Sequence, residues 1–256
     1  MIALLLAATL TDLPTVLARI AESQEKASEA RKGIVYTQEV RAKLLRANGK
    51  VAREERHVYL VTPTAKGTEK KRIEFRGAYE SGGKMVPFDE PGFVHKRLDI
   101  DADMMKGLVE ELLNDGSRDG LGKDFFPLTR DKQREYDFRL EGNVLHFDPE
   151  SRGFTWRGEM EIDPADGMPR RLSSGLSRTI PRWAQATFGT NFHQLGFSAT
   201  YKKVTEGLWF PATFGTEFKF RVLFGYARTV IIDVVNRDFR KASVESSIQY
   251  DLPEAK

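Results

Sequence analysis

The chain has 256 residues, of which 40% are hydrophobic and 11% aromatic, a composition that supports a packed core and excludes an intrinsically disordered protein. Its 40 basic and 37 acidic residues are interleaved and give a net charge of +3, whereas nucleic-acid-binding proteins concentrate basic residues in one stripe. The absence of cysteine excludes disulfide bonds, thiol catalysis and cysteine-ligated metals.

The first ten residues form an apolar run that is too short to cross a bilayer, which needs about 20 residues. The run resembles the apolar region of a secretory signal peptide, with Ala7 and Ala8 as small residues for cleavage, but the usual basic residues before it are missing. We therefore expect 1–10 to be the remnant of a signal peptide on an exported protein. The alternative is an apolar first turn of the helix that follows.

A helix is predicted over 11–32, because Asp12 is a capping residue and Pro14 fits the first turn. Its apolar residues recur at helical spacing, so one face is expected to lie on a sheet and the opposite face in solvent. The residues expected to be buried are Leu13, Leu17 and Ile20, and those expected to be exposed are Glu22 and Glu25.

Most of the remaining chain alternates between polar and apolar residues, which is typical of antiparallel strands with one buried face. A first meander is expected over 35–45, 51–61 and 68–79, with a tight turn at Asn48-Gly49. A second meander is expected over 136–177, and strands follow over 191–204 and 212–222. The pattern predicts a mainly β (α+β) protein: a single strongly curved antiparallel sheet forming an unclosed barrel, with an N-terminal helix and a middle helix against its concave face.

The middle segment, 80–130, interrupts the strand pattern. It is irregular over 80–99, predicts a helix over 101–114, and then returns to a loop rich in glycine and aspartate. We expect it to form a lid or insertion over the sheet, with Gly82 and Gly83 as hinges. Residues 11–256, with this segment included, are expected to form one domain.

The C-terminal strands carry the candidate site. Strand 212–222 places aromatic residues on one face, and 226–236 has apolar residues on both faces, which predicts an interior strand covered on both sides. A last strand is expected over 242–250. An apolar cavity is predicted here, with Trp209 and Tyr226 at its rim, where their polar tips meet water. Its expected lining residues are Phe214, Phe218, Phe220, Val230 and Ile232.

No pattern of catalytic or metal-binding residues stands out. His57 and His146 fall in separate predicted strands and are expected to be polar strand residues, and no Gly-x-Ser-x-Gly turn occurs. Glu159, Glu161 and Asp163 alternate along one strand and are expected on its solvent side, although paired carboxylates can serve a glycosidase. We therefore expect no metal, no cofactor and no enzymatic activity.

Several short motifs resemble one family. They are Tyr36-Thr37-Gln38, Asn48-Gly49-Lys50, the turn over 162–167 followed by Arg170-Arg171, Gly207-Leu208-Trp209-Phe210-Pro211, and Asp238-Phe239-Arg240-Lys241. Together they make the chain over 33–250 similar to the bacterial outer-membrane lipoprotein-sorting proteins, which are related in fold to the periplasmic Lol lipoprotein carriers. The resemblance implies a periplasmic protein that holds an acyl chain or a lipoprotein in an apolar half-barrel. It also implies an alternative, an envelope protein-interaction or sensor module with no transported lipid. The chain departs from the carriers in its lack of cysteine and its long middle segment.

Overall fold

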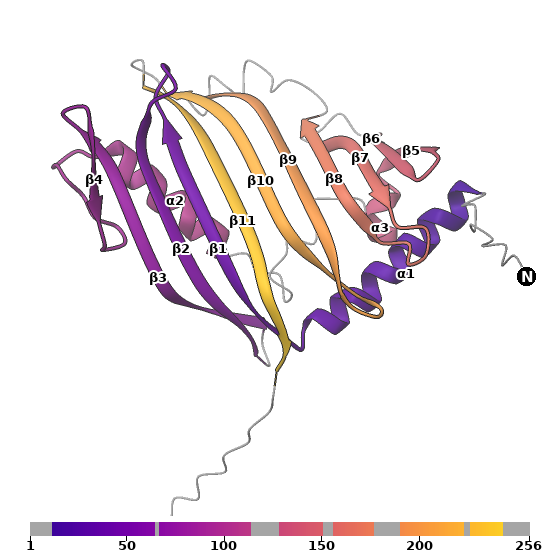
Figure 1. Cartoon of the computed structure of the whole chain (residues 1–256). Helices are drawn as coiled ribbons and strands as arrows, with labels where there is room; N and C mark the ends of the chain where they lie inside the picture. The colour runs from indigo at the N-terminus through magenta and orange to yellow at the C-terminus, as the bar shows by residue number, and fades with distance from the viewer. Residues whose placement is uncertain are drawn as a thin grey trace, which may run out of the picture.

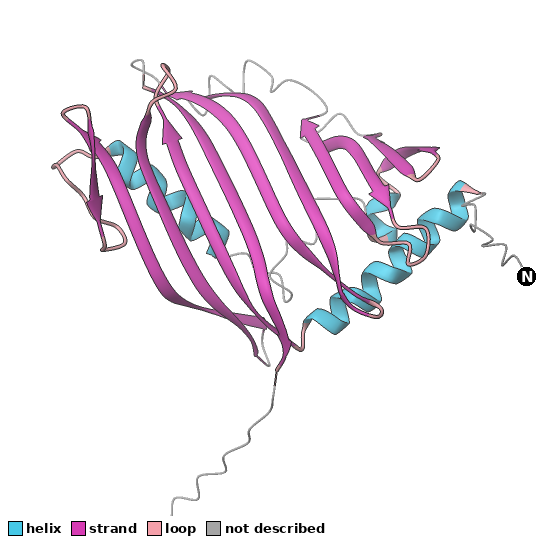
Figure 2. Ribbon diagram, viewed as in Figure 1, coloured by secondary structure: helices cyan, strands magenta, loops and turns pink. Residues whose placement is uncertain are grey.

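The computed structural model describes residues 12–64, 67–113, 128–150, 156–176, 190–222 and 226–242, and within these ranges it leaves out the side chains of 111–113, 176, 190–195 and 220–222. This part of the chain forms one curved antiparallel sheet with three helices (Figures 1 and 2). The helices are α1 (Leu13–Arg31), α2 (Ile100–Leu113) and α3 (Arg130–Gln133). The strands are β1 (Ile34–Leu45), β2 (Val51–Thr64), β3 (Gly67–Ser81), β4 (Lys84–Phe88), β5 (Tyr136–Glu141), β6 (Val144–Pro149), β7 (Trp156–Ile162), β8 (Pro169–Leu176), β9 (Thr190–Thr205), β10 (Leu208–Val222) and β11 (Ala227–Lys241).

The first and last of these strands meet in the middle of the sheet. The strand order is β4-β3-β2-β1-β11-β10-β9-β8-β7-β6-β5, and β1 pairs with β11 so that Val40 lies opposite Val234. Strands β4 and β5 are the two edges, so the sheet is not closed (Figure 1). The prediction of a single, unclosed antiparallel sheet in a mainly β protein is confirmed.

Glycines with positive φ close the tight turns. Gly49 has φ +80°, and its N–H donates to the Arg46 carbonyl oxygen at 2.8 Å in the β1–β2 turn. Gly82 and Gly83, at φ +58° and +83°, turn β3 into β4. The expectation of an irregular loop that starts at residue 80 is therefore wrong over Lys84–Phe88, because the turn at Gly82 and Gly83 lets these residues pair with β3.

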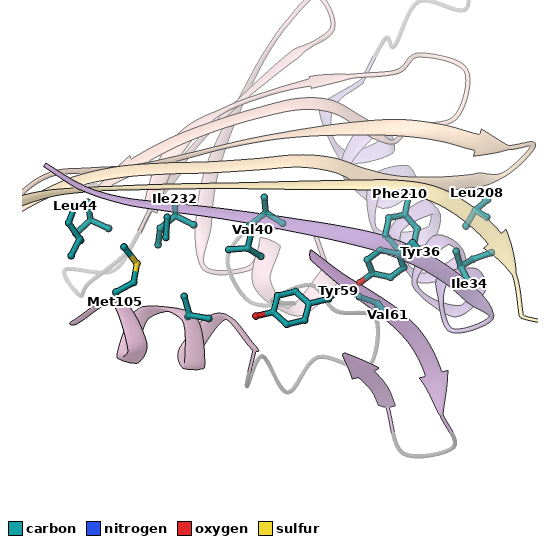
Figure 3. Packing of buried hydrophobic residues seen from close by; sticks show 14 residues of the cluster. Ile34, Tyr36, Val40, Leu44, Tyr59, Val61, Met105, Leu208, Phe210 and Ile232 are labelled. Carbon is teal, nitrogen blue, oxygen red and sulfur yellow. The ribbon is translucent and has the colours of Figure 1, made fainter. Parts of the chain in front are cut away.

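Helices α1 and α2 pack on the same face of the sheet, which we call the inner face. The register across neighbouring strands puts these inner-face residues in one row: Leu145, Met160, Leu172, Ala199, Phe214, Val234 and Val40. Val16 and Ile20 of α1 pack in the cluster that contains Leu145 and Leu172. Met105 of α2 packs in the cluster that contains Val40, as Figure 3 shows. The predicted packing of an N-terminal and a middle helix against the sheet is confirmed.

Helix α1 is buried along one face, as its sequence predicts. Ile20 is fully buried, and Glu22 and Glu25 are exposed. Leu13 and Leu17 are only partly buried at the edge of the cluster. The most buried positions also include Val16, Ala27 and Arg31, whose Nη1 donates to the Trp209 carbonyl oxygen at 3.1 Å and so ties the end of α1 to β10.

Strand β11 is an interior strand, but it is covered on one face only. Val230, Ile232 and Val234 are buried, whereas Asp233 and Val235 are exposed. The prediction of cover on both sides is wrong, because both helices lie on the inner face. The predicted strand over 242–250, the apolar run over 1–10 and the lid residues over 114–127 lie outside the described residues, apart from Ala242.

Candidate functional site

Half-buried aromatic side chains lie on the inner face between the two helices. We call Trp156, Phe197, Phe214 and Phe218 the aromatic strip. The ring centroids of Trp156 and Phe197 are 4.4 Å apart, and those of Phe197 and Phe214 are 5.4 Å apart. Phe214 packs against both the cluster under α1 and the cluster under α2. The strip therefore connects the cluster under α1 with the cluster under α2, and its own side chains remain partly exposed to solvent.

The apolar residues proposed to line the cavity divide between this strip and α2. Phe214 and Phe218 belong to the strip. Val230 and Ile232 are buried in the cluster that contains Met105, so α2 contributes to their cover (Figure 3). Phe220 belongs to β10, but its side chain lies outside the described residues.

The two predicted rim residues have carboxylate partners. Trp209 is buried against Ala27, and its Nε1 donates to Asp166 Oδ2 at 2.7 Å. The hydroxyl of Tyr226 donates to Asp101 Oδ1. Each polar tip thus contacts a partly exposed carboxylate. Trp209 is buried, unlike the water-facing rim residue expected from sequence, whereas Tyr226 is half-buried.

Asp101 fixes the first turn of α2 to β11. Arg228 Nε and Nη2 donate to Asp101 Oδ1 and Oδ2 at 2.8 and 2.9 Å, and the guanidinium lies 4.3 Å from the centroid of the Tyr226 ring. Burial raises the pKa of Asp101, but the hydrogen bonds from Arg228 and Tyr226 outweigh it and hold this pKa below its usual value. Burial, followed by the bond to Asp101, raises the pKa of the Tyr226 hydroxyl. The result is a charged clamp at the start of α2.

A row of polar side chains occupies the inner face of β2, at alternate positions from Arg53 to Tyr59. Arg53 Nε donates to Glu55 Oε1 at 2.8 Å, and Glu55 Oε2 lies 2.9 Å from His57 Nε2. His57 Nδ1 lies 3.1 Å from the Tyr59 hydroxyl oxygen. A carboxylate can only accept a hydrogen bond, so in the neutral form of His57 the ring proton lies on Nε2 and points at Glu55. The Tyr59 hydroxyl then donates to Nδ1. Burial raises the pKa of Tyr59 to about 12.

This polar row is linked to α2 and shielded from solvent. Arg53 Nη1 lies 3.8 Å from Asp99 Oδ2, and Asp99 Oδ1 accepts from the backbone N–H of Ala102 in the first turn of α2. Arg53 is 1% exposed and His57 2% exposed. A substrate in solvent cannot reach groups that are this deeply buried, so the row does not form an open catalytic site. Its contact with Asp99 anchors α2 instead.

Sequence reasoning missed this row, although a signal was present. Residues 51–61 contain few large apolar side chains, and the positions between Arg53, Glu55 and His57 are also charged, namely Glu54 and Arg56. The pairing of Ala42 with Glu55 and of Val40 with His57 puts the polar set on the inner face. That register is a tertiary property, which the strand's own sequence does not contain.

The acidic residues of β7 and of the turn that follows it serve different roles. Glu159 is exposed, as expected, but Asp163 is buried and the expectation of a solvent-facing side chain is wrong there. Asp163 Oδ1 accepts from the backbone N–H groups of Ala165 and Asp166 at 2.9 Å, and Oδ2 accepts from Arg170 Nε at 2.9 Å. Asp163 therefore organises the β7–β8 turn.

The described residues contain no group of three or more histidine, aspartate or glutamate side chains placed to hold a metal ion. Among the helices that the structure describes, none combines the length and the apolar character needed to cross a bilayer.

No family model matches the chain, and no curated protein sequence matches it. Among solved structures, the chain is similar to lipovitellin, in a structure that concerns lipid–protein interactions, with a TM-score of 0.40 and 11% identity over 84% of this chain and 26% of the lipovitellin chain. It is also similar to a DUF1329 family protein from Desulfovibrio piger, with a TM-score of 0.35 and 10% identity over 91% of this chain and 94% of that one. The chain thus spans about a quarter of the lipovitellin chain. At these TM-scores the similarity supports no statement about the ligand or the function of this chain. Neither structure is described as a lipoprotein-sorting protein, so that resemblance stays a prediction.

Proposed function

We propose that the protein is a non-enzymatic carrier that binds an apolar chain of the acyl class on the aromatic strip. The observation that carries the proposal is the strip itself: half-buried aromatic rings from β7, β9 and β10, in contact with one another, between two helix-covered cores. Export to the periplasm and a lipoprotein cargo belong to the same proposal. They rest on the apolar run over 1–10 and on the resemblance to the lipoprotein-sorting proteins.

The physical chemistry of the strip suits an acyl chain. Burying one CH₂ group contributes about 0.8 kcal/mol, so a long chain can bind by contact with apolar side chains alone. Phe214 and Phe218 lie on one strand at i and i+4, with Thr216 between them on the same face. The Thr216 hydroxyl donates to the Gly196 carbonyl oxygen at 2.8 Å, so its polar group is already satisfied. The strip therefore offers an apolar surface without a charge or a reactive group in its centre.

The proposal is tested by the binding of a fluorescent fatty acid to wild type, Phe218→Glu and Val235→Glu. Phe218 is half-buried in the strip, whereas Val235 is 37% exposed on the opposite face of β11 and provides the matched control. We expect Phe218→Glu to weaken binding about tenfold or more, because a carboxylate in the contact surface has to be desolvated. Val235→Glu should bind as wild type does.

Circular dichroism has to show that both variants are folded before their affinities are compared. Unchanged affinity in folded Phe218→Glu, or a wild-type protein that binds no apolar probe, would favour the envelope protein-interaction or sensor module instead. Native mass spectrometry of protein purified without detergent identifies any lipid that co-purifies. Fractionation of the native host tests export separately: unprocessed full-length protein found in the cytosol alone would refute it.

A further inference from the structure

Exposed apolar side chains gather where β4 leads into α2. We call residues 89–99 the β4–α2 loop. Within and next to it, Val94 is 51% exposed, Leu98 72% and Ile100 44%. A single exposed leucine is ordinary on a protein surface. Here three apolar side chains are left in solvent within seven residues, at the β4 edge of the sheet, where Figure 2 shows the loop in pink.

The loop is held rigidly by the side chains that alternate with these exposed ones. The Phe93 carbonyl oxygen accepts from Arg53 Nη2 at 2.8 Å, and the Phe93 ring stacks on Phe88 with 5.2 Å between centroids. The His95 ring stacks on Tyr79 with 4.4 Å between centroids. These contacts fix the loop to the polar row and to β3 and β4.

The far end of the loop is fixed as well. His95 Nδ1 lies 2.6 Å from Asp99 Oδ2, and Asp99 caps α2 through Ala102. The exposure of Val94 and Leu98 is therefore a feature of an ordered loop. Little conformational entropy has to be lost when such a loop binds a partner.

The exposed charges between Val94 and Leu98 are basic. Lys96 and Arg97 lie between Val94 and Leu98 and are both exposed. The nearest carboxylates in sequence, Asp99 and Asp101, are engaged by Arg53 and Arg228. The exposed acidic residues of the neighbourhood are Asp89 and Glu90, at the start of the loop, and Asp103, on α2. Residues 94–98 thus combine two exposed cations with two exposed apolar side chains.

We propose that the β4–α2 loop docks the protein on an anionic lipid surface. Apolar side chains that enter the headgroup region, combined with basic residues that attract anionic lipids, provide reversible attachment to a membrane. A protein partner fits the loop less well, because a stable protein interface buries about 800 Å² on each side, more than three side chains supply. Docking and ligand binding are separable, since the loop and the aromatic strip share no residue.

Co-flotation with vesicles tests the proposal on the full chain. Vesicles of phosphatidylcholine mixed with phosphatidylglycerol should carry the wild-type protein upward, and vesicles of phosphatidylcholine alone should carry much less. Leu98→Ser should lower the partition coefficient about tenfold, because one leucine no longer leaves water. Lys96→Gln and Arg97→Gln should each lower it about fivefold. Added salt should weaken binding, because it screens the exposed charges.

Ile73→Ser is the matched control, because Ile73 is also an exposed apolar residue, at 56%, but lies on β3 outside the loop. It should partition as wild type does, and a fluorescent fatty acid should bind Leu98→Ser as it binds wild type. The proposal is overturned if wild type fails to float with the anionic vesicles. It is also overturned if Leu98→Ser floats unchanged, or if Ile73→Ser loses as much binding as Leu98→Ser. A failure of fatty-acid binding with intact flotation would count against the carrier function alone.

Discussion

Replacing Asp101 with asparagine removes the clamp that fixes α2 to the sheet. The wild-type carboxylate accepts two hydrogen bonds from Arg228, at 2.8 and 2.9 Å, and one from Tyr226. Arg228 is 15% exposed, so the variant leaves a largely buried guanidinium without its counter-ion. Breaking a buried ion pair by removing one partner costs about 3–5 kcal/mol. Because both groups keep some solvent contact, we expect Asp101→Asn to lower the free energy of unfolding by about 3 kcal/mol at neutral pH.

The pH dependence of this loss has a definite sign. The pKa of Asp101 is lowered in the folded protein, so its contribution to stability is present above the unfolded pKa, about 3.9, and is lost as the pH falls through the folded value. The difference between wild type and Asp101→Asn should therefore shrink in acid. Urea denaturation followed by circular dichroism at a series of pH values measures it.

Asp103→Asn provides the matched control. Asp103 lies in the same first turn of α2 and is exposed, so both variants remove one negative charge near the helix N-terminus. Asp103→Asn should cost less than about 1 kcal/mol. Equal losses in the two variants, or a loss in Asp101→Asn that does not change with pH, would refute the clamp.

Two further predictions concern the sheet. The hydrogen bond from Arg56 lowers the pKa of Glu39 to about 2, so Glu39→Gln should lower the free energy of unfolding by about 2 kcal/mol at neutral pH, after screening of the exposed arginines. In urea denaturation this difference should vanish as the pH falls from about 4.5 towards 2, and a difference that persists in acid would contradict the prediction. A Cβ at Gly158 would lie 2.0 Å from the Ser173 carbonyl oxygen, so Gly158→Ala should lower stability by about 3 kcal/mol or more in thermal unfolding. Gly107→Ala is the control and should be stabilising, because the space around Gly107 is open. Equal stability of the two variants would count against the close approach of β7 and β8.

The sequence predicts the elements of this fold well because each strand carries its own alternation. β1, β3 and β9 start and end within about two residues of the ranges that the alternation predicts, and α2 lies where its apolar spacing puts it. The strand order could not be predicted in the same way. β10 is the strand that directly precedes β11, but nothing local to β11 says that its other neighbour is β1, because that pairing joins segments about 190 residues apart.

The same contrast between local pattern and long-range contact applies to the candidate site. The inner-face positions of Phe214 and Phe218 follow from the alternation of their own strand. The cover over Val230 and Ile232 was not found, because it depends on which helix lies above them. Trp209 and Tyr226 were expected to face water, since their carboxylate partners, Asp166 and Asp101, are remote in sequence.

The anchoring of α2 also favours the aromatic strip, over the space beneath α2, as the site of the proposed apolar ligand. A chain that entered beneath α2 would have to separate Asp101 from Arg228 and Asp99 from Arg53, at about 3–5 kcal/mol for each buried pair. An acyl chain of about ten CH₂ groups gains about 8 kcal/mol by burial, so displacing α2 would cancel most or all of that gain. A chain on the aromatic strip breaks neither ion pair. Folded Asp101→Asn should therefore bind a fluorescent fatty acid with wild-type affinity, whereas tighter binding in this variant would place the ligand beneath α2.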